Sequence, residues 1–199
     1  MLGVHIAHVL SLRLDVYVVR LLGSLAQVGT YALASQISEL LLHLGRAFKI
    51  VVFSGAARGC DARGLHVRAL MGWIVASACM LPLVLVGAHH GIFQRFFGDT
   101  AVGFEPALLL RIPGALATAL TLVVTGGFLG RGQVGLALRA NLLPVPVFLV
   151  LVWPLALAWE PATAAASAFS IAAVVQVIWV GRAMRNGSAM FSPSNGTWT

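Results

Sequence analysis

The chain has 199 residues, of which 59% are hydrophobic and 10% are charged, and its formal net charge is +7. Soluble domains carry about 25% charged residues, so this composition excludes an ordinary soluble globular protein. The 13 basic residues are spread along the chain and do not cluster with aromatic residues in a polar segment, which excludes a typical nucleic-acid-binding surface. The two cysteines, Cys60 and Cys79, imply no disulfide framework.

Six apolar windows have roughly the 20-residue length that a helix needs to cross a bilayer core. The predicted membrane-spanning helices are 2–22, 28–53, 65–86, 107–129, 136–157 and 162–180. Most of the connections are short and rich in Gly, Ser or Pro, which is typical of tight loops. We therefore expect an all-α integral membrane protein, with a bundle of six transmembrane helices over residues 1–184 and a disordered cytoplasmic tail over residues 185–199.

The longest connection, residues 88–106, contains apolar residues at helical spacing beside Arg95. These are Ile92, Phe93, Phe96 and Phe97. Such a pattern predicts a short amphipathic turn that lies at the membrane interface.

The distribution of basic residues predicts the orientation of the bundle. If the first helix starts in the cytoplasm, seven arginines fall in or near connections on that same side: Arg58, Arg63, Arg68, Arg131, Arg139, Arg182 and Arg185. The opposite connections contain Arg95 as their single basic residue, beside Asp99, Glu105 and Glu160. Because Lys and Arg are retained on the cytoplasmic side, we expect a multi-pass protein of the plasma membrane with both termini in the cytoplasm.

The stretch SLRLDVYVVRLLG, residues 11–23, places three charges inside the first apolar helix, namely Arg13, Asp15 and Arg20. An ionised residue near the centre of a membrane helix disfavours membrane insertion by about 2.5 to 3.5 kcal/mol. Each Leu, Ile, Phe or Val favours insertion by only about 0.3 to 0.6 kcal/mol. This helix is therefore unsuited to contact lipid on all sides. Intramembrane charges usually face a bundle interior or a watery cavity.

Helical spacing divides these charges between two faces. Arg13 and Arg20 are seven residues apart and share one face, while His8 and Asp15 occupy roughly the opposite face. The first helix therefore offers two polar faces.

The second helix carries a single polar stripe at spacings of three and four residues. It comprises Ser35, Glu39, His43, Arg46 and Lys49. If the first two helices are antiparallel, Glu39 falls at a depth between Arg13 and Arg20, and we predict that it pairs with one or both of them. His43 would titrate nearby, because imidazole changes charge near neutral pH.

Several of these basic residues have a second interpretation. Arg20 would snorkel to the outer interface, and Arg46 and Lys49 would only anchor the cytoplasmic end of their helix. Arg111 is either an anchor near the start of the fourth helix or is turned inward by a kink at Pro113.

Two motif patterns are set aside. The sequence GRGQVG at residues 130–135 matches a dinucleotide-binding pattern, but it lies between two apolar helices where that fold needs a strand, so we interpret it as a tight turn. No cluster of Cys or carboxylates completes a metal site around the histidines, and no Ser/His/Asp arrangement suggests nucleophilic chemistry. We expect no enzymatic activity, cofactor or metal.

The stretch RLDVYVVRLLGSLAQVGTYALASQISELLLHLGRAFKIVVFSGAAR, residues 13–58, resembles the helix pair that opens the second lobe of polysaccharide flippases. It has an intramembrane Asp, then G-x-Y-x-x-A at residues 29–34, then a helical Glu. Further segments resemble later landmarks of that lobe in the expected order: FFGD, LRIPGAL, FLGRGQVGLALRANLL and PATAAASAFS. The resemblance covers about residues 1–182 and concerns loose patterns of small residues.

This resemblance implies the multidrug, oligosaccharidyl-lipid and polysaccharide exporter superfamily, in which two helical bundles face each other across a cavity. It implies that the chain is the C-terminal lobe of an ion-coupled flippase, driven by protons or sodium, that moves undecaprenyl-diphosphate-linked oligosaccharides such as O-antigen units across the bacterial inner membrane. Asp15, Tyr31 and Glu39 take the positions of the motif, and basic residues would line the cavity. The candidate substrate or ion pathway comprises Arg13, Asp15, Arg20, Glu39, His43, Arg46 and Arg111.

Two points stay open at this stage. Alternating access needs two lobes, so we expect either a missing N-terminal lobe, which we favour, or a second copy or separate partner. The alternatives to a flippase are a cation-coupled multidrug exporter and a non-transporting membrane scaffold. The intramembrane charges are more basic than acidic, which favours an anionic cargo because arginine binds phosphate oxygens strongly.

Overall fold

The computed structural model describes residues 13–58, 62–89, 91–98 and 104–190. These residues contain helices and no strands, which confirms the expected all-α class. After a helical segment over residues 13–22, the helices are α2 (Leu25–Ala57), α3 (Ala62–His89), α4 (Ile92–Phe97), α5 (Phe104–Gly130), α6 (Val134–Leu142), α7 (Pro144–Ala158) and α8 (Pro161–Met190).

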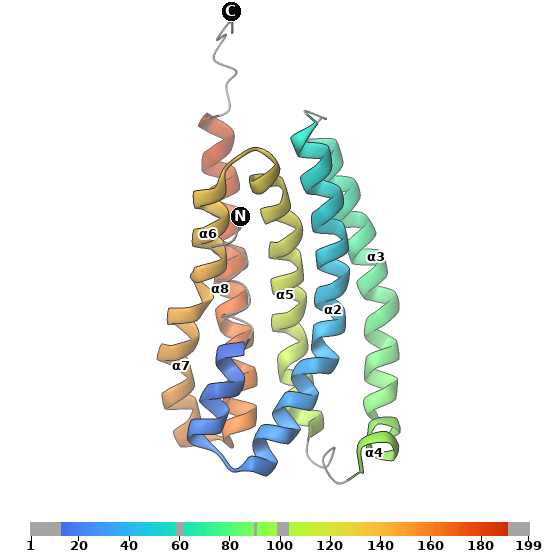
Figure 1. Cartoon of the computed structure of the whole chain (residues 1–199), viewed down its shortest axis with the longest axis vertical. Helices are drawn as coiled ribbons and strands as arrows, with labels where there is room; N and C mark the ends of the chain where they lie inside the picture. Colours follow the sequence, from blue (N-terminus) through green and yellow to red (C-terminus); the bar gives the residue numbers. More distant parts are fainter. Residues whose placement is uncertain (1–12, 59–61, 90, 99–103, 191–199) are drawn as a thin grey trace, which may run out of the picture.

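The long helices lie side by side along one axis, with α5 in the middle (Figure 1). α2, α5 and α8 run in one direction, while α3, α6 and α7 run in the other (Figure 1). Because α5 is central, it is more buried than its neighbours. In its most apolar stretch of 18 residues, 67% is buried, compared with 17% for the corresponding stretch of α3. The core of the bundle is therefore built around α5, with α2 and α8 on either side of it.

Within the part of the chain that the structure describes, five helical stretches are long and apolar enough to cross a membrane: Leu25–Ala57, Val67–Gly87, Phe104–Gly130, Val134–Ala158 and Pro161–Arg185. The stretch Val134–Ala158 combines α6 and α7. Large apolar side chains such as Leu83, Val150 and Leu157 are exposed on the outer surface. These features are compatible with a multi-pass membrane protein. Most of the first predicted span, 2–22, lies outside the described residues.

Small residues allow α2 and α5 to approach closely. A Cβ atom added to Gly126 of α5 would lie 2.6 Å from the backbone oxygen of Lys49, and one added to Gly130 would lie 2.6 Å from that of Phe53. The two glycines form a G-x-x-x-G pair, which in membrane helices permits backbone contact. This seam fixes the upper part of α5 against α2.

The predicted fifth helix, 136–157, is divided at Leu143 into α6 and α7. The division coincides with Pro144 and Pro146, which lack backbone N–H donors and so interrupt the helical hydrogen-bond ladder. The turn before α6 contains Gly132 at φ +75°, so GRGQVG connects two helices and follows no strand. At the other end of the chain, α8 continues to Met190, past residue 185 where the tail was expected to begin.

Candidate functional site: a buried ion pair beside a charged helix face

Arg111 of α5 lies at the centre of a buried polar cluster. Its side chain is 0% exposed, and its Nη1 donates a hydrogen bond of 2.5 Å to Oδ2 of Asp15, which is 1% exposed. Its Nε donates to Oγ of Ser38 on α2 at 3.0 Å. The hydroxyl of Tyr31 donates to the same Asp15 oxygen at 2.8 Å and also accepts from Arg111 Nη1. Three elements of the fold thus meet at one carboxylate.

An aromatic ring from a fourth element completes the surroundings of Arg111. The centre of its guanidinium lies 4.2 Å from the ring centroid of Phe169 on α8, and 5.0 Å from that of Tyr31. Attraction between a cation and an aromatic face is strongest where water is excluded, as here. Nη2 of Arg111 has no hydrogen-bond partner among the described residues.

Burial of Arg111 decides between the two interpretations that the sequence left open. The side chain points into the bundle, so the interpretation as an interfacial anchor is wrong. Pro113 lies two residues further along, inside α5. The pairing of Arg111 with Asp15 was not predicted. The available signal was that Asp15, on the face opposite Arg13, needs a cation from another helix if it is buried and ionised.

A second ion pair joins Arg13 and Glu39. Arg13 Nη2 lies 3.5 Å from Glu39 Oε2, with side-chain exposures of 53% and 13% respectively. The predicted pairing of Glu39 with an arginine of the first helix is therefore confirmed for Arg13. Arg20 is exposed and forms no ion pair with another described residue, so the interpretation that it snorkels to an interface stays a prediction.

Two serines of α2 connect the ion pairs. Ser35 Oγ donates to Glu39 Oε1 at 3.3 Å, and Ser38 Oγ donates to the backbone oxygen of Ser35 at 2.8 Å. Since Ser38 also accepts from Arg111, one turn of α2 touches both pairs. The two cations and two carboxylates cancel in formal charge.

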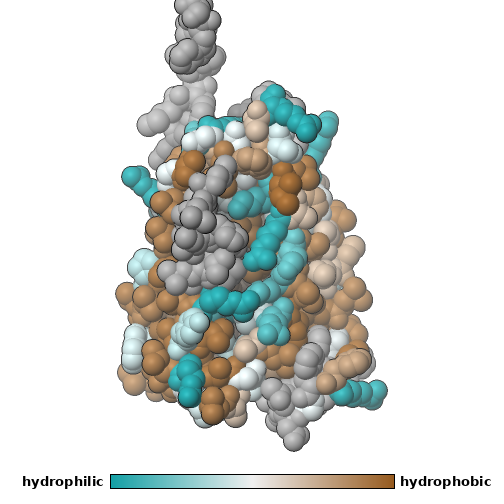
Figure 2. Space-filling model, viewed as in Figure 1, coloured by the Kyte–Doolittle hydropathy of each residue, from teal (hydrophilic) through white to brown (hydrophobic). Residues whose placement is uncertain are grey.

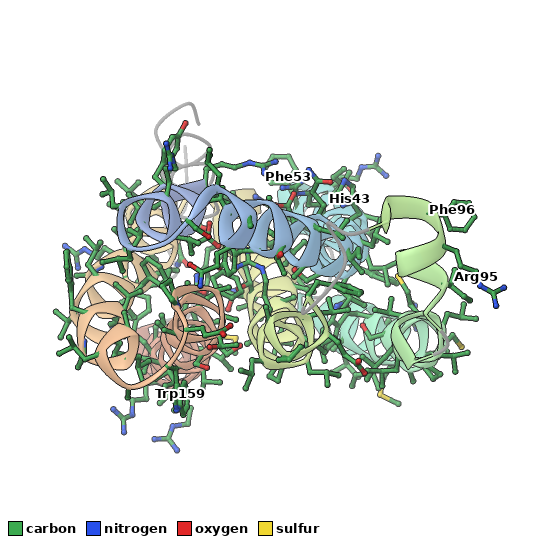
Figure 3. All side chains as sticks on the ribbon, turned by 90° about the horizontal axis from the view of Figure 1, so that it is seen from below. His43, Phe53, Arg95, Phe96 and Trp159 are labelled. Carbon is green, nitrogen blue, oxygen red and sulfur yellow. The ribbon has the colours of Figure 1, made fainter. Side chains whose placement is uncertain are left out.

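Beyond Glu39, the predicted stripe of α2 extends over the surface. His43 is exposed, while Arg46 and Lys49 are half-buried. Figure 2 shows hydrophilic residues in a band across a face that is otherwise largely apolar. Figure 3 shows His43 on the side of α2 that is turned away from α5. Its Nδ1 lies 2.7 Å from the backbone oxygen of Glu39, so it contacts its own helix and not the Glu39 carboxylate.

The stripe and Arg13 together define what we call the charged face: Arg13, Glu39, His43, Arg46 and Lys49. It combines three basic residues, one carboxylate and one imidazole. Glu39 is near the middle of α2, so this face crosses the part of the helix that a bilayer core would surround.

The chain matches no protein-family model, no curated protein and no solved structure. The resemblance to polysaccharide flippases thus depends on the residue patterns alone and stays a prediction. Among the described residues, no group of three or more His, Cys, Asp or Glu side chains is arranged to hold a metal ion. His8, predicted to share a face with Asp15, lies outside the described residues.

Proposed function

We propose that this chain is one lobe of a membrane transporter that moves an anionic, lipid-linked glycan across the bacterial inner membrane. The substrate class is undecaprenyl-diphosphate-linked oligosaccharide, and the role is in the synthesis of surface polysaccharide such as O-antigen. The observation that supports this proposal best is the charged face, which has more cations than carboxylates and crosses an otherwise apolar helix bundle.

The physical argument begins with the cost of charge in lipid. Each ionised residue at the centre of a membrane helix costs about 2.5 to 3.5 kcal/mol, so the charged face needs a polar environment. A second lobe on the other side of this face would enclose a cavity that supplies water and a polar cargo. That lobe is an N-terminal half or, alternatively, a second copy of the chain.

The excess of cations sets the charge of the cargo. Arg13 is compensated by Glu39, whereas Arg46 and Lys49 have no carboxylate partner among the described residues. Ammonium and guanidinium groups in a low-dielectric cavity attract a diphosphate strongly. A multidrug exporter for organic cations, the alternative within the same superfamily, would need an acidic cavity instead.

The remaining parts of the proposal concern coupling and orientation. We assign Asp15, Glu39 and His43 as the groups that respond to protons or sodium, because these are the ionisable side chains beside the cations. Arg58 and Arg131 lie at the same end of the bundle as the C-terminal end of α8. By the positive-inside rule we assign this end to the cytoplasm.

Complementation tests the proposal. The complete gene is expressed in a strain that lacks its flippase and accumulates lipid-linked precursor inside the cell. Wild-type protein is expected to restore surface glycan, and the double variant Arg46→Gln, Lys49→Gln is expected to abolish it at equal expression. Arg95→Gln is the matched control, because Arg95 projects away from the bundle (Figure 3).

Two results would count against the proposal. If surface glycan stays absent although the wild-type protein is well expressed, and precursor still accumulates, the flippase function fails for that glycan. If glycan is restored equally by the double variant, the charged face does not bind the cargo. Restored drug resistance without glycan would favour the multidrug exporter, and neither activity would favour a non-transporting scaffold.

A further inference from the structure

A hydroxyl group of α8 contacts the backbone of α5 beside Pro113. Pro113 has no N–H, so the carbonyl of Leu109 lacks its usual helical donor. The contacts with α8 involve the next residue pair along the helix, Gly114 and Leu110. The N–H of Gly114 donates to Ser170 Oγ at 3.0 Å, and Ser170 Oγ donates to the carbonyl of Leu110 at 2.5 Å. Ser170 thus bridges two backbone groups that an unbroken helix joins directly.

Close approach of α8 makes this bridge possible. A Cβ atom added to Gly114 would lie 2.7 Å from both the Cα and the Oγ of Ser170. Only glycine at this position leaves room for the serine hydroxyl to enter the α5 ladder.

α8 provides a second bridge at the break between α6 and α7. Pro144 has no N–H, so the carbonyl of Ala140, four residues earlier, lacks its helical donor. Gln176 Nε2 donates to this carbonyl at 2.8 Å, and Gln176 is only 2% exposed. Two side chains of α8 therefore bind backbone groups near Pro113 of α5 and Pro144 of α7.

The Ser170 contact on α5 is adjacent to the buried ion pair. The carbonyl that Ser170 binds belongs to Leu110, the residue before Arg111, and the residue before Ser170 is Phe169, whose ring contacts the Arg111 guanidinium. A change of bend at Pro113 would move Arg111 with respect to Asp15.

We propose that α8 is a clasp that sets the bend of α5 and of α6–α7 through Ser170 and Gln176. When Ser170 is bound to Leu110 and Gly114, Arg111 is held on Asp15. When Ser170 releases them, residues 104–112 pivot at Pro113 and separate Arg111 from Asp15. This device belongs to the folded chain itself, so its test needs no substrate and does not depend on the transport proposal.

Hydrogen exchange in lipid nanodiscs tests the α5 bridge. Ser170→Ala is expected to increase amide exchange in residues 110–114 by about fivefold to tenfold, the effect of losing one hydrogen bond. Ser167→Ala is the matched control on the same helix, because Ser167 Oγ donates only to the Thr163 backbone oxygen of α8 itself, at 2.8 Å. Equal exchange in the two variants would overturn the proposal.

Double variants test whether the bridges act through the prolines. Pro113→Ala removes the ring that crowds this turn of α5, so the N–H of Gly114 can bond directly to the carbonyl of Leu110. Ser170→Ala is therefore expected to have a much smaller effect in that background than in the wild type. The same comparison applies to Gln176→Leu with and without Pro144→Ala. Equal effects in both backgrounds would show that the bridges do not compensate for the breaks. If Ser170→Ala does not fold alone, Pro113→Ala and Pro113→Ala/Ser170→Ala are compared by thermal denaturation, and a lower Tm of the double variant overturns the proposal.

Spin-label distances test the link to Arg111. Labels are placed at Tyr17 and Leu109, which are 70% and 45% exposed, in a chain whose two native cysteines are replaced by alanine. Ser170→Ala is expected to broaden the distribution of distances between the two labels, as Asp15→Asn does. A distribution unchanged by Ser170→Ala would show that the clasp does not control the position of Arg111.

Discussion

Asp15 and Arg111 are 96 residues apart in the sequence and are joined by a hydrogen bond of 2.5 Å, with both side chains excluded from the surface. A buried pair of this kind is asymmetric in its energetics. Removing one partner leaves an uncompensated buried charge, whereas replacing both by apolar residues of similar volume is often neutral.

Asp15→Asn is therefore expected to lower the free energy of unfolding by about 3 to 5 kcal/mol, because Arg111 keeps its charge without a counter-ion. The double variant Asp15→Asn, Arg111→Met is expected to recover most of this loss. Unfolding in mixed detergent micelles, followed by the helical signal in circular dichroism, measures both. If the double variant is as unstable as Asp15→Asn, the unpaired charge of Arg111 is not the cause of the lost stability.

Tyr31→Phe removes the hydroxyl that donates to Asp15 and accepts from Arg111. The expected loss in the free energy of unfolding is about 1 to 3 kcal/mol, because the buried side chains of Asp15 and Arg111 each lose a hydrogen-bond partner. Tyr17→Phe provides the control, since Tyr17 is 70% exposed. If both variants unfold alike, the Tyr31 hydroxyl contributes nothing to the cluster.

The Arg13 and Glu39 pair is expected to matter little for stability and more for activity. Arg13 is 53% exposed, so Glu39→Gln should cost no more than about 1 kcal/mol. In the complementation assay, exchanging the two residues as Arg13→Glu, Glu39→Arg is expected to restore part of the activity that each single variant loses. No rescue at all would contradict a functional pairing.

The seam between α2 and α5 leads to a packing prediction. Gly126→Leu is expected to destabilise the bundle by about 1 to 3 kcal/mol or more, since its side chain would meet the α2 backbone at Lys49. Gly135→Leu is the control, because a Cβ atom there has no neighbour within 4 Å. Thermal denaturation of the two variants in nanodiscs separates the effects, and equal melting temperatures would argue against the seam.

The local part of the site could be predicted from the sequence. Glu39 and Arg13 lie on consecutive helices joined by a tight turn, so antiparallel packing and helical periodicity were enough to bring them together. The apolar windows also located the long helices, because hydrophobic length is a local property.

The non-local part could not be predicted in the same way. α5 is apolar on nearly all sides, so periodicity does not reveal which neighbour receives Arg111. The roles of Ser38, Phe169 and Ser170 depend on which helices pack beside α5. The division of the predicted fifth helix at Leu143 was missed because averaging over a window conceals the effect of two prolines, although both are visible in the sequence.

The glycine seam has a mechanical consequence for the whole bundle. It joins the upper part of α5 to α2 backbone against backbone, so we expect these two segments to move together. Below that contact, α5 contains Pro113 and carries Arg111 on its lower portion. We therefore expect a change of bend at Pro113 to move the end of α5 opposite Arg58 and Arg131 more than the end that the seam joins to α2.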